Sequence, residues 1–357
     1  MKSGSVASQA EECAQDVMAT VWQKAHLFDP SRASVATWIF TIARNRRIDG
    51  LRKDRQPEPE DLFWGPDSEP DQADVYEMQQ ENARLGRAIA RLPEAQRALI
   101  ERAFLRRPHP PGTRGRDRTS PRNHQVADPA RAGPSAPAYE LSETMTIRHH
   151  VSDALLTAYA AGTLSEAFSL VVATHLSLCD ECRARAGALD AVGGSLMEET
   201  APVALSEGSL ASVMAQLDRQ IQRPAPARRA DPRAPAPLAD YVGRRLEDVR
   251  WRTLGGGVRQ AILPTGGEAI ARLLWIPGGQ AVPDHGHRGL ELTLVLQGAF
   301  RDETDRFGAG DIEIADQELE HTPVAERGLD CICLAATDAP LRFNSFLPKL
   351  VQPFFRI

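Results

Sequence analysis

The chain has 357 residues, of which 42% are hydrophobic and 25% charged, and its formal net charge is -6. This length predicts two or three domains, and the mild charge excludes a field that attracts nucleic acid over the whole chain. Five cysteines, four of them in two close pairs, favour metal or redox chemistry in a reducing compartment over a framework of disulfides.

Neither a leader nor a membrane span is expected from the sequence. The N-terminal stretch MKSGSVASQAEEC contains no apolar run of the kind that signal peptides carry. The most apolar stretch, FSLVVATHLSL, is too short and too polar to cross a bilayer. We therefore expect a cytoplasmic protein without a membrane partner.

Residues 9–60 form the first predicted unit, and residues 9–55 of it are predicted to be helical. ECAQDVMATVWQKAHLF places four apolar residues on one stripe, Val17, Val21, Trp22 and Ala25. ATWIFTIARNRRIDGLRKDR predicts a second helix with a basic end suited to phosphate contacts, although basic stripes are usually solvated faces. Trp38 and Phe40 could stack on bases or pack in a core. The candidate DNA-binding residues are Arg44, Arg46, Arg47, Arg52 and Lys53.

The next part of the chain alternates between linkers and one helix. Residues 56–75 are acidic and rich in proline, which is typical of a linker. Residues 80–105 are helical in pattern, with Pro93 placed for a helix start. The tract at 106–144 is dense in Arg, Pro and Gly and lacks apolar periodicity, so we expect it to be disordered.

A second helical block is predicted over 145–200, followed by a linker at 224–237. Ser152 suits a helix N-cap. The apolar face that follows it consists of Leu155, Leu156 and Tyr159. Short alternating runs between Gly and Pro turns then predict an antiparallel β-barrel over 238–350. The expected fold class is therefore multidomain α + β.

The segment HLSLCDECR raises the question of a metal site. On a helix, His175, Cys179 and Cys182 share one face, and they supply three ligands of a tetrahedral zinc site. His150 is our candidate for the fourth ligand and His149 is its rival. The alternative is a set of ordinary buried residues on a helix face, because cysteine is often buried.

The same block resembles a known family. MTIRHHVSDALLTAYAAGTLSEAFSLVVATHLSLCDECR looks like the N-terminal domain of ChrR-type zinc-binding anti-sigma factors. The resemblance implies that His150, His175, Cys179 and Cys182 bind zinc. It also implies that this helical unit clasps an extracytoplasmic-function (ECF) sigma factor.

A second metal site is predicted in the β region. In GGQAVPDHGHRGLELTLVLQG, His285 and His287 point the same way along a strand, and Glu291 can return across a turn. His321 completes a set suited to a divalent metal, and the alternative is surface histidines near a turn. The spacing resembles a cupin metal motif. ChrR-type proteins carry a C-terminal cupin, and this resemblance favours zinc over Fe, Mn or Ni.

Two further cysteines, Cys331 and Cys333, share one face of the strand CICLAAT. They are either packed thiols or redox-active groups. The cupin set also permits an alternative function as a metal-dependent enzyme, such as a dioxygenase or an isomerase.

The N-terminal segment resembles region 2 of ECF sigma factors, which implies contact with the RNA polymerase core and promoter DNA. ARLGRAIARLPEAQRALIERAF is similar to the start of sigma region 4, but the helix-turn-helix that should follow is replaced by the Arg/Pro/Gly tract. The first helix of region 2 is also missing. We hypothesise that a reading-frame shift joined a sigma gene to its anti-sigma gene, with Met145 as the former start.

These observations together predict a regulator and not an enzyme. The zinc-bound helices would sequester an ECF sigma factor, and the cupin domain would release it under oxidative stress from singlet oxygen or peroxides. The partial sigma factor would fold back on the anti-sigma helices of its own chain. An active ECF sigma factor is the remaining alternative.

Overall fold

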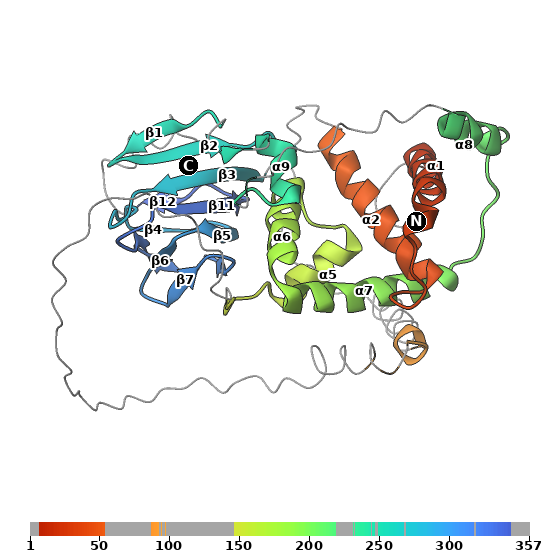
Figure 1. The fold of residues 1–357 in the computed structure, drawn as a ribbon, viewed down its shortest axis with the longest axis horizontal. Helices are drawn as coiled ribbons and strands as arrows, with labels where there is room; N and C mark the ends of the chain where they lie inside the picture. Colours follow the sequence, from red (N-terminus) through yellow and green to blue (C-terminus); the bar gives the residue numbers. More distant parts are fainter. Residues whose placement is uncertain are drawn as a thin grey trace, which may run out of the picture.

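The computed structural model describes most of the helical and β regions (Figure 1). The described residues are 7–53, 87–92, 94, 97, 146–218, 231, 233–243, 245–246, 249–267, 269–317 and 319–343. The predicted linker at 56–75 and the predicted disordered tract at 106–144 lie outside them, as does most of the segments 80–105 and 224–237.

Two helices form the N-terminal unit, as predicted. Helix α1 (Ala7–Lys24) leads through the short 3-10 helix η1 (Ala25–Leu27) to α2 (Val35–Lys53). The predicted apolar stripe of α1 is wrong in part, because Trp22 is 71% exposed whereas Val17 is buried. Helix α1 faces α2 through the side of Thr20, to which Arg46 donates, so the Trp22 side is left in solvent.

Three helices form the central unit. They are α5 (Asp153–Ala161), α6 (Glu166–Leu178) and α7 (Asp180–Glu198). The predicted cap is confirmed, because the Ser152 hydroxyl accepts from the Leu155 amide at 3.4 Å. Gly162 ends α5 in the left-handed conformation with φ of 67°, which glycine adopts without strain. Helix α8 (Ser209–Asp218) follows and packs on α1.

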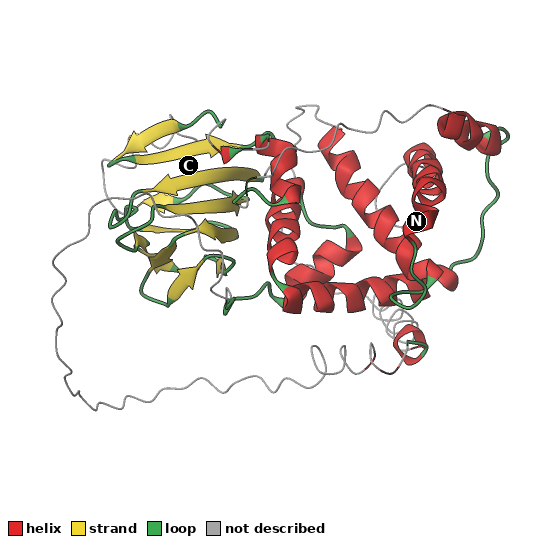
Figure 2. Ribbon diagram, viewed as in Figure 1, coloured by secondary structure: helices red, strands yellow, loops and turns green. Residues whose placement is uncertain are grey.

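The C-terminal region is an antiparallel β structure that follows the short helix α9 (Ala236–Val242), which confirms the predicted class (Figure 2). Three sheets form it, ordered β1-β2-β3-β11-β5-β8, β10-β6-β7 and β12-β4-β9. The strands are β1 (Arg252–Gly255), β2 (Val258–Ile262), β3 (Ile270–Ile276), β4 (His285–Gly286), β5 (Glu291–Gln297), β6 (Ala299–Arg301), β7 (Arg306–Gly308), β8 (Ile312–Ala315), β9 (Glu320–His321), β10 (Val324–Ala325), β11 (Cys331–Thr337) and β12 (Arg342–Phe343).

Helix α6 joins the helical and β regions. It packs on β3, β5 and β11 of the large sheet (Figure 1). One continuous core therefore includes Leu156 and Val171 from the helices and Leu273, Leu292 and Leu334 from the sheet. Every one of these side chains is essentially excluded from solvent, so the helical unit and the sheet share their apolar burial.

Among the described residues, no single helix is long and apolar enough to cross a membrane. Helices α5 and α6 would meet that test only as a pair, and they are bent by 112° at their junction.

Candidate metal centres and helix-docking surface

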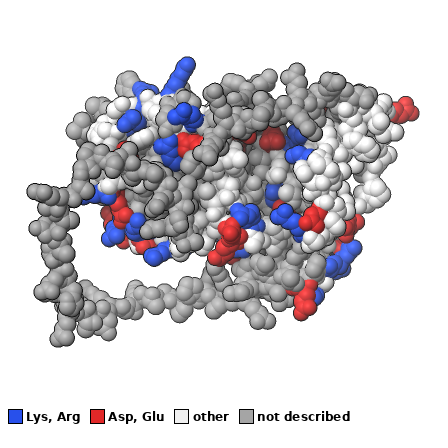
Figure 3. Space-filling model, in the orientation of Figure 1, with Lys and Arg blue, Asp and Glu red and all other residues white. Residues whose placement is uncertain are grey.

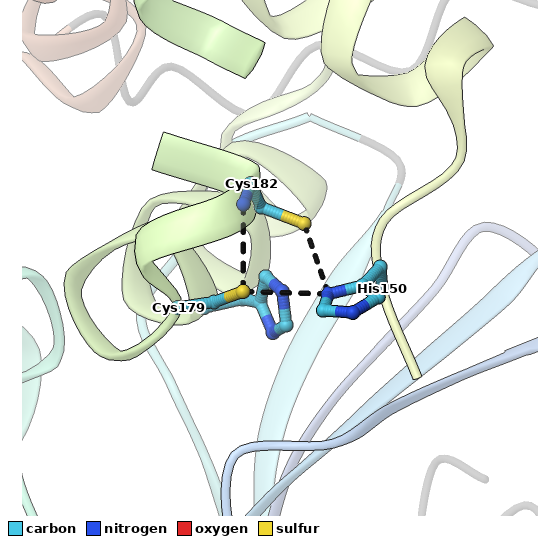
Figure 4. Close-up of side chains that lie close together, drawn as sticks. His150, Cys179 and Cys182 are labelled. Carbon is cyan, nitrogen blue, oxygen red and sulfur yellow. Dashed lines mark hydrogen bonds between the residues drawn. The ribbon is translucent and has the colours of Figure 1, made fainter. Parts of the chain in front are cut away.

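The four residues predicted for the first metal site come together where α6 meets α7 (Figure 4). His150 lies in the extended segment before α5, and its Nδ1 is 3.3 Å from the Cys179 Sγ and 3.5 Å from the Cys182 Sγ. A tetrahedral zinc ion with ordinary bond lengths would separate an imidazole nitrogen from a thiolate by roughly 3.6 Å. The spacing of these atoms therefore fits a zinc ion.

The fourth residue, His175, has its imidazole fixed in the orientation a ligand needs. Its Nδ1 is 3.0 Å from the carbonyl oxygen of Gly310, and its Nε2 is buried without a hydrogen-bond partner among the described residues. Burial lowers the pKa of His175 to about 4, so the ring is neutral. A neutral ring that donates through one nitrogen and leaves the other free is typical of a metal-bound histidine.

The thiols also indicate a cation. Burial and the neighbouring Cys179 raise the pKa of Cys182 to about 12. A thiolate at this position consequently needs a positive ion beside it, which is what a bound divalent metal supplies. We propose that these two cysteines and two histidines hold zinc.

His149, the rival of His150 for the same ligand position, turns toward the β region instead. Its backbone N–H and that of Arg148 both donate to the Asp311 carboxylate, at 2.9 and 2.6 Å. Its ring lies 4.4 Å from that of Phe307. The segment that carries His150 is thus anchored on the turn between β7 and β8, which also supplies the Gly310 carbonyl to His175.

The second predicted set lies in the β region, inside the space between the sheets. The ring nitrogens of His285, His287 and His321 lie within 4.8 Å of one another, and all three side chains are buried. The Glu291 carboxylate is 3.5 Å from the His287 Nδ1 and accepts from the Thr293 hydroxyl at 3.0 Å. The three histidines form a group suited to a divalent metal, and Glu291 lies at its edge.

Two carboxylates that the sequence did not indicate support this set. Asp302 and Glu313 contact the Nδ1 of His321 at 2.9 and 3.2 Å, which leaves the Nε2 of that ring toward the other histidines. Burial opposes the charge on His321, but the hydrogen bonds that its ring donates to these carboxylates raise its pKa to about 9. Burial raises the pKa of Glu313 to about 7. Carboxylates in this position orient a ligand histidine and increase its basicity.

Cys331 and Cys333 are packed thiols. Their sulfur atoms are 3.5 Å apart, and both side chains are buried. The contact with Cys331 and burial raise the pKa of Cys333 well above its usual value. A protonated, buried thiol reacts slowly, so the redox alternative loses its chemical basis.

The basic end of α2 lies on the central helices. Arg44 forms a buried ion pair with Asp190 of α7, and its guanidinium lies 4.9 Å from the Tyr159 ring centroid. Thr41 also donates to Asp190, at 3.1 Å. Arg47 donates to the Gly162 carbonyl at 2.9 Å.

The docking gives three of the predicted DNA-binding residues partners within the protein, and their binding to DNA stays a prediction. Arg44, Arg46 and Arg47 were candidates for DNA phosphates, but in this structure each contacts the protein itself. The side chains of Arg52 and Lys53 lie outside the described residues. On the face shown in Figure 3, the described basic side chains lie among acidic ones rather than in one stripe.

Two adjacent glycines let α2 approach α7. A Cβ atom at Gly194 would lie 2.6 Å from the backbone nitrogen of Thr37. A Cβ atom at Gly193 would lie 2.2 Å from the Phe40 ring. Real Cβ atoms do not come so close to other atoms, so the crossing depends on glycine at these positions.

Comparisons with known proteins match the two ends of the chain to different families. Residues 3–56 match the sigma-70 region 2 family, and residues 241–339 match the ChrR cupin-like domain. One chain of the crystal structure of Rhodobacter sphaeroides SigE in complex with the anti-sigma ChrR is 94% identical to this protein, over 54% of this chain and 100% of that chain, with a TM-score of 0.49. The chain belongs to the ChrR family. It also carries, at residues 3–56, the segment that matches sigma-70 region 2.

Curated relatives of this ChrR-family chain are ECF RNA polymerase sigma factors. SigK of Mycolicibacterium vanbaalenii is 30% identical over 100 residues, which cover 27% of this chain and 50% of that protein. SigK of Mycobacterium tuberculosis H37Rv is 26% identical over 99 residues, which cover 27% of this chain and 53% of that protein. The chain spans about half the length of these curated relatives.

We expect Cys182→Ala to remove one equivalent of bound zinc and to lower the thermal midpoint by about 10 °C, because short helices lose their cross-link. Elemental analysis and thermal unfolding measure the two effects. Cys13→Ala, in α1, is the matched control and should retain the metal. An unchanged zinc content in the Cys182 variant would exclude this site.

Asp302→Asn should weaken metal binding at the three cupin histidines by about 10- to 100-fold, because His321 loses an acceptor that orients its ring. A competition titration with a metal-sensitive dye measures the change. Glu207→Gln, which is exposed to solvent and lies outside the β region, is the control. Equal affinities in the two variants would show that Asp302 does not support the site.

Proposed function

We propose that this ChrR-family protein is a zinc-dependent anti-sigma factor whose helical unit holds sigma region 2, and that its own region 2-like helices occupy that surface. The observation that carries the proposal is the docking of α2 on α7 and α5. The cupin domain would act as the sensor that controls this grip.

The docking surface has the chemistry that a basic sigma helix requires. Asp190 is nine-tenths buried at the centre of the crossing, and burial raises its pKa. Such a carboxylate is costly to bury alone, and the Arg44 guanidinium offsets that cost. The Gly193–Gly194 pair admits the α2 backbone, so shape and charge select the same partner helix.

The zinc site lies where it could relay a signal from the cupin domain. The turn between β7 and β8 contacts both the His150 segment, through Asp311, and His175, through Gly310. A change in the cupin domain would therefore disturb two zinc ligands at once. We propose that oxidative stress, from singlet oxygen or peroxides, is the stimulus, since oxidised thiolates no longer bind zinc.

The proposal places the protein in the cytoplasm, where sigma factors meet RNA polymerase. While α2 is docked, Arg44 and Arg47 are held by the anti-sigma helices, which opposes contact with promoter DNA. Binding of the polymerase core and activity as an ECF sigma factor would first require release.

The cavity beside the cupin histidines favours a second candidate, a metal-dependent cupin enzyme such as a dioxygenase or an isomerase. Multiple turnovers of a small substrate by the purified, metal-loaded chain would support it.

Deletion of residues 1–140 should increase the affinity for a purified ECF sigma factor by at least about tenfold, because the docking surface becomes vacant. In that shortened chain, Gly194→Ala should abolish binding by clashing with the incoming helix backbone. Gly187→Ala, on the same helix with nothing within 4 Å of its Cβ position, should leave the affinity unchanged.

Calorimetry of the four proteins provides the measurement. If deletion leaves the affinity unchanged, the N-terminal helices do not occupy the sigma surface. If the shortened chain binds no sigma factor at all, the anti-sigma function itself is refuted.

A further inference from the structure

The β region encloses a cavity of about 440 Å³ between its sheets. This volume is in the range of small-molecule sites, which are roughly 300–1,000 Å³. Its walls are mostly apolar, and one part of them carries polar groups. The residues that line it include Arg272, Leu274, Ile276, Glu291, Phe300 and Thr337.

Strand register separates a polar end of the cavity from an apolar end. Alternate residues of a strand face the same side, so Arg272, Leu274 and Ile276 of β3 point into the cavity in that order. Arg272 pairs with Ala335, whose other neighbour is Thr293, whereas Leu274 pairs with Cys333. Arg272, Ala335 and Thr293 therefore lie side by side across three strands, near Glu291 and the cupin histidines. Leu274 and Ile276 lie farther along β3 and form the apolar end of the cavity.

Arg272 is a buried charged residue in the wall of this cavity whose hydrogen bonds are incomplete. Its side chain belongs to a residue that is only 5% exposed, and its Nε has no hydrogen-bond partner among the described residues. Its Nη2 donates to the Thr337 hydroxyl over a long 3.5 Å. A buried guanidinium has five N–H donors to satisfy, and leaving them unmade is costly.

The neighbouring carboxylate does not fully satisfy this arginine. Glu291 is the nearby charge that favours the charged form of Arg272, against the burial that lowers its pKa. The Glu291 carboxylate is itself engaged by Thr293 and lies beside His287. Donors of Arg272 thus remain available at the cavity wall.

We propose that the cupin cavity binds a small organic carboxylate with an apolar tail, with its carboxylate on Arg272 and its tail along Leu274, Ile276 and Phe300. The planar fork of arginine matches a carboxylate with two parallel hydrogen bonds. A phosphate dianion fits less well, because its second negative charge would lie beside the Glu291 carboxylate in the same part of the cavity. This ligand site is separate from the surface that holds the sigma helix.

Calorimetry of the full chain with sodium octanoate and with 1-octanol tests the proposal. The two probes share the tail and differ in the headgroup. We expect octanoate to bind about tenfold or more tightly than octanol, because only the acid pairs with the guanidinium. Arg272→Gln should remove this preference, whereas Arg259→Gln, exposed on the outer side of the adjacent strand β2, should keep it.

A second pair of variants separates the arginine from the metal. His285→Ala/His287→Ala should retain the preference for the acid, since Arg272 is intact. Loss of the preference in this double variant, with retention in Arg272→Gln, would mean that a histidine-bound ion holds the carboxylate and would overturn the proposal. Equal binding of octanoate and octanol by the unaltered chain would also overturn it. If Arg272→Gln does not fold, Arg272→Lys should weaken octanoate binding because the fork is lost.

None of these measurements involves a sigma factor. Failure of octanoate binding therefore leaves the anti-sigma proposal standing, and failure of sigma binding leaves the ligand site standing.

Discussion

The convergence of two thiols and two imidazoles between α6 and α7 is the constraint on which the helical unit depends. Helices α5 and α6 have 9 and 13 residues, and isolated helices shorter than about 12–15 residues are marginal in water. Binding of one ion by residues from the segment before α5, from α6 and from α7 would fix all three helices relative to one another. The docking surface for α2 consists of these same helices, so its shape depends on the four ligands.

Helix α6 also links the cluster of cysteines and histidines to the β region. Its last turn carries His175, while its buried side packs on the strands that form the cupin cavity. The apolar core is continuous across this contact, and close-packed cores transmit small displacements instead of absorbing them. The Cys/His cluster, the cavity and the surface on which α2 docks are therefore connected through one helix and one turn.

Much of the clustering of the candidate metal ligands could be predicted from the sequence because these residues lie close together in the chain. His175, Cys179 and Cys182 span eight positions and His285 and His287 span three, and local spacing decides which face they share. His150 was the sequence-based candidate and His149 its rival; the two are adjacent and chemically equal, and only the structure separates them by placing the His150 Nδ1 beside the two sulfur atoms. Asp302 and Glu313 gave no signal, because only the tertiary fold brings them to His321.

The helix-docking surface was the least predictable part. Arg44 and Asp190 are 146 positions apart, and a basic run gives no indication of a buried partner. Trp22 was assigned to the wrong side of α1 because periodicity identifies an apolar stripe without showing which neighbour will cover it. The glycine pair in α7 had no evident purpose until α2 was seen against it.

The two adjacent glycines, Gly193 and Gly194, also lower the stability of α7 itself. Each glycine in a helix interior lowers helical stability by about 1 kcal/mol relative to alanine, and two adjacent ones make a weak point in the C-terminal third of this helix. With a partner helix lying across it, this point is braced by backbone contact. Without one, α7 can bend or fray there, so departure of the sigma helix would leave the empty surface less well formed and would slow its recapture.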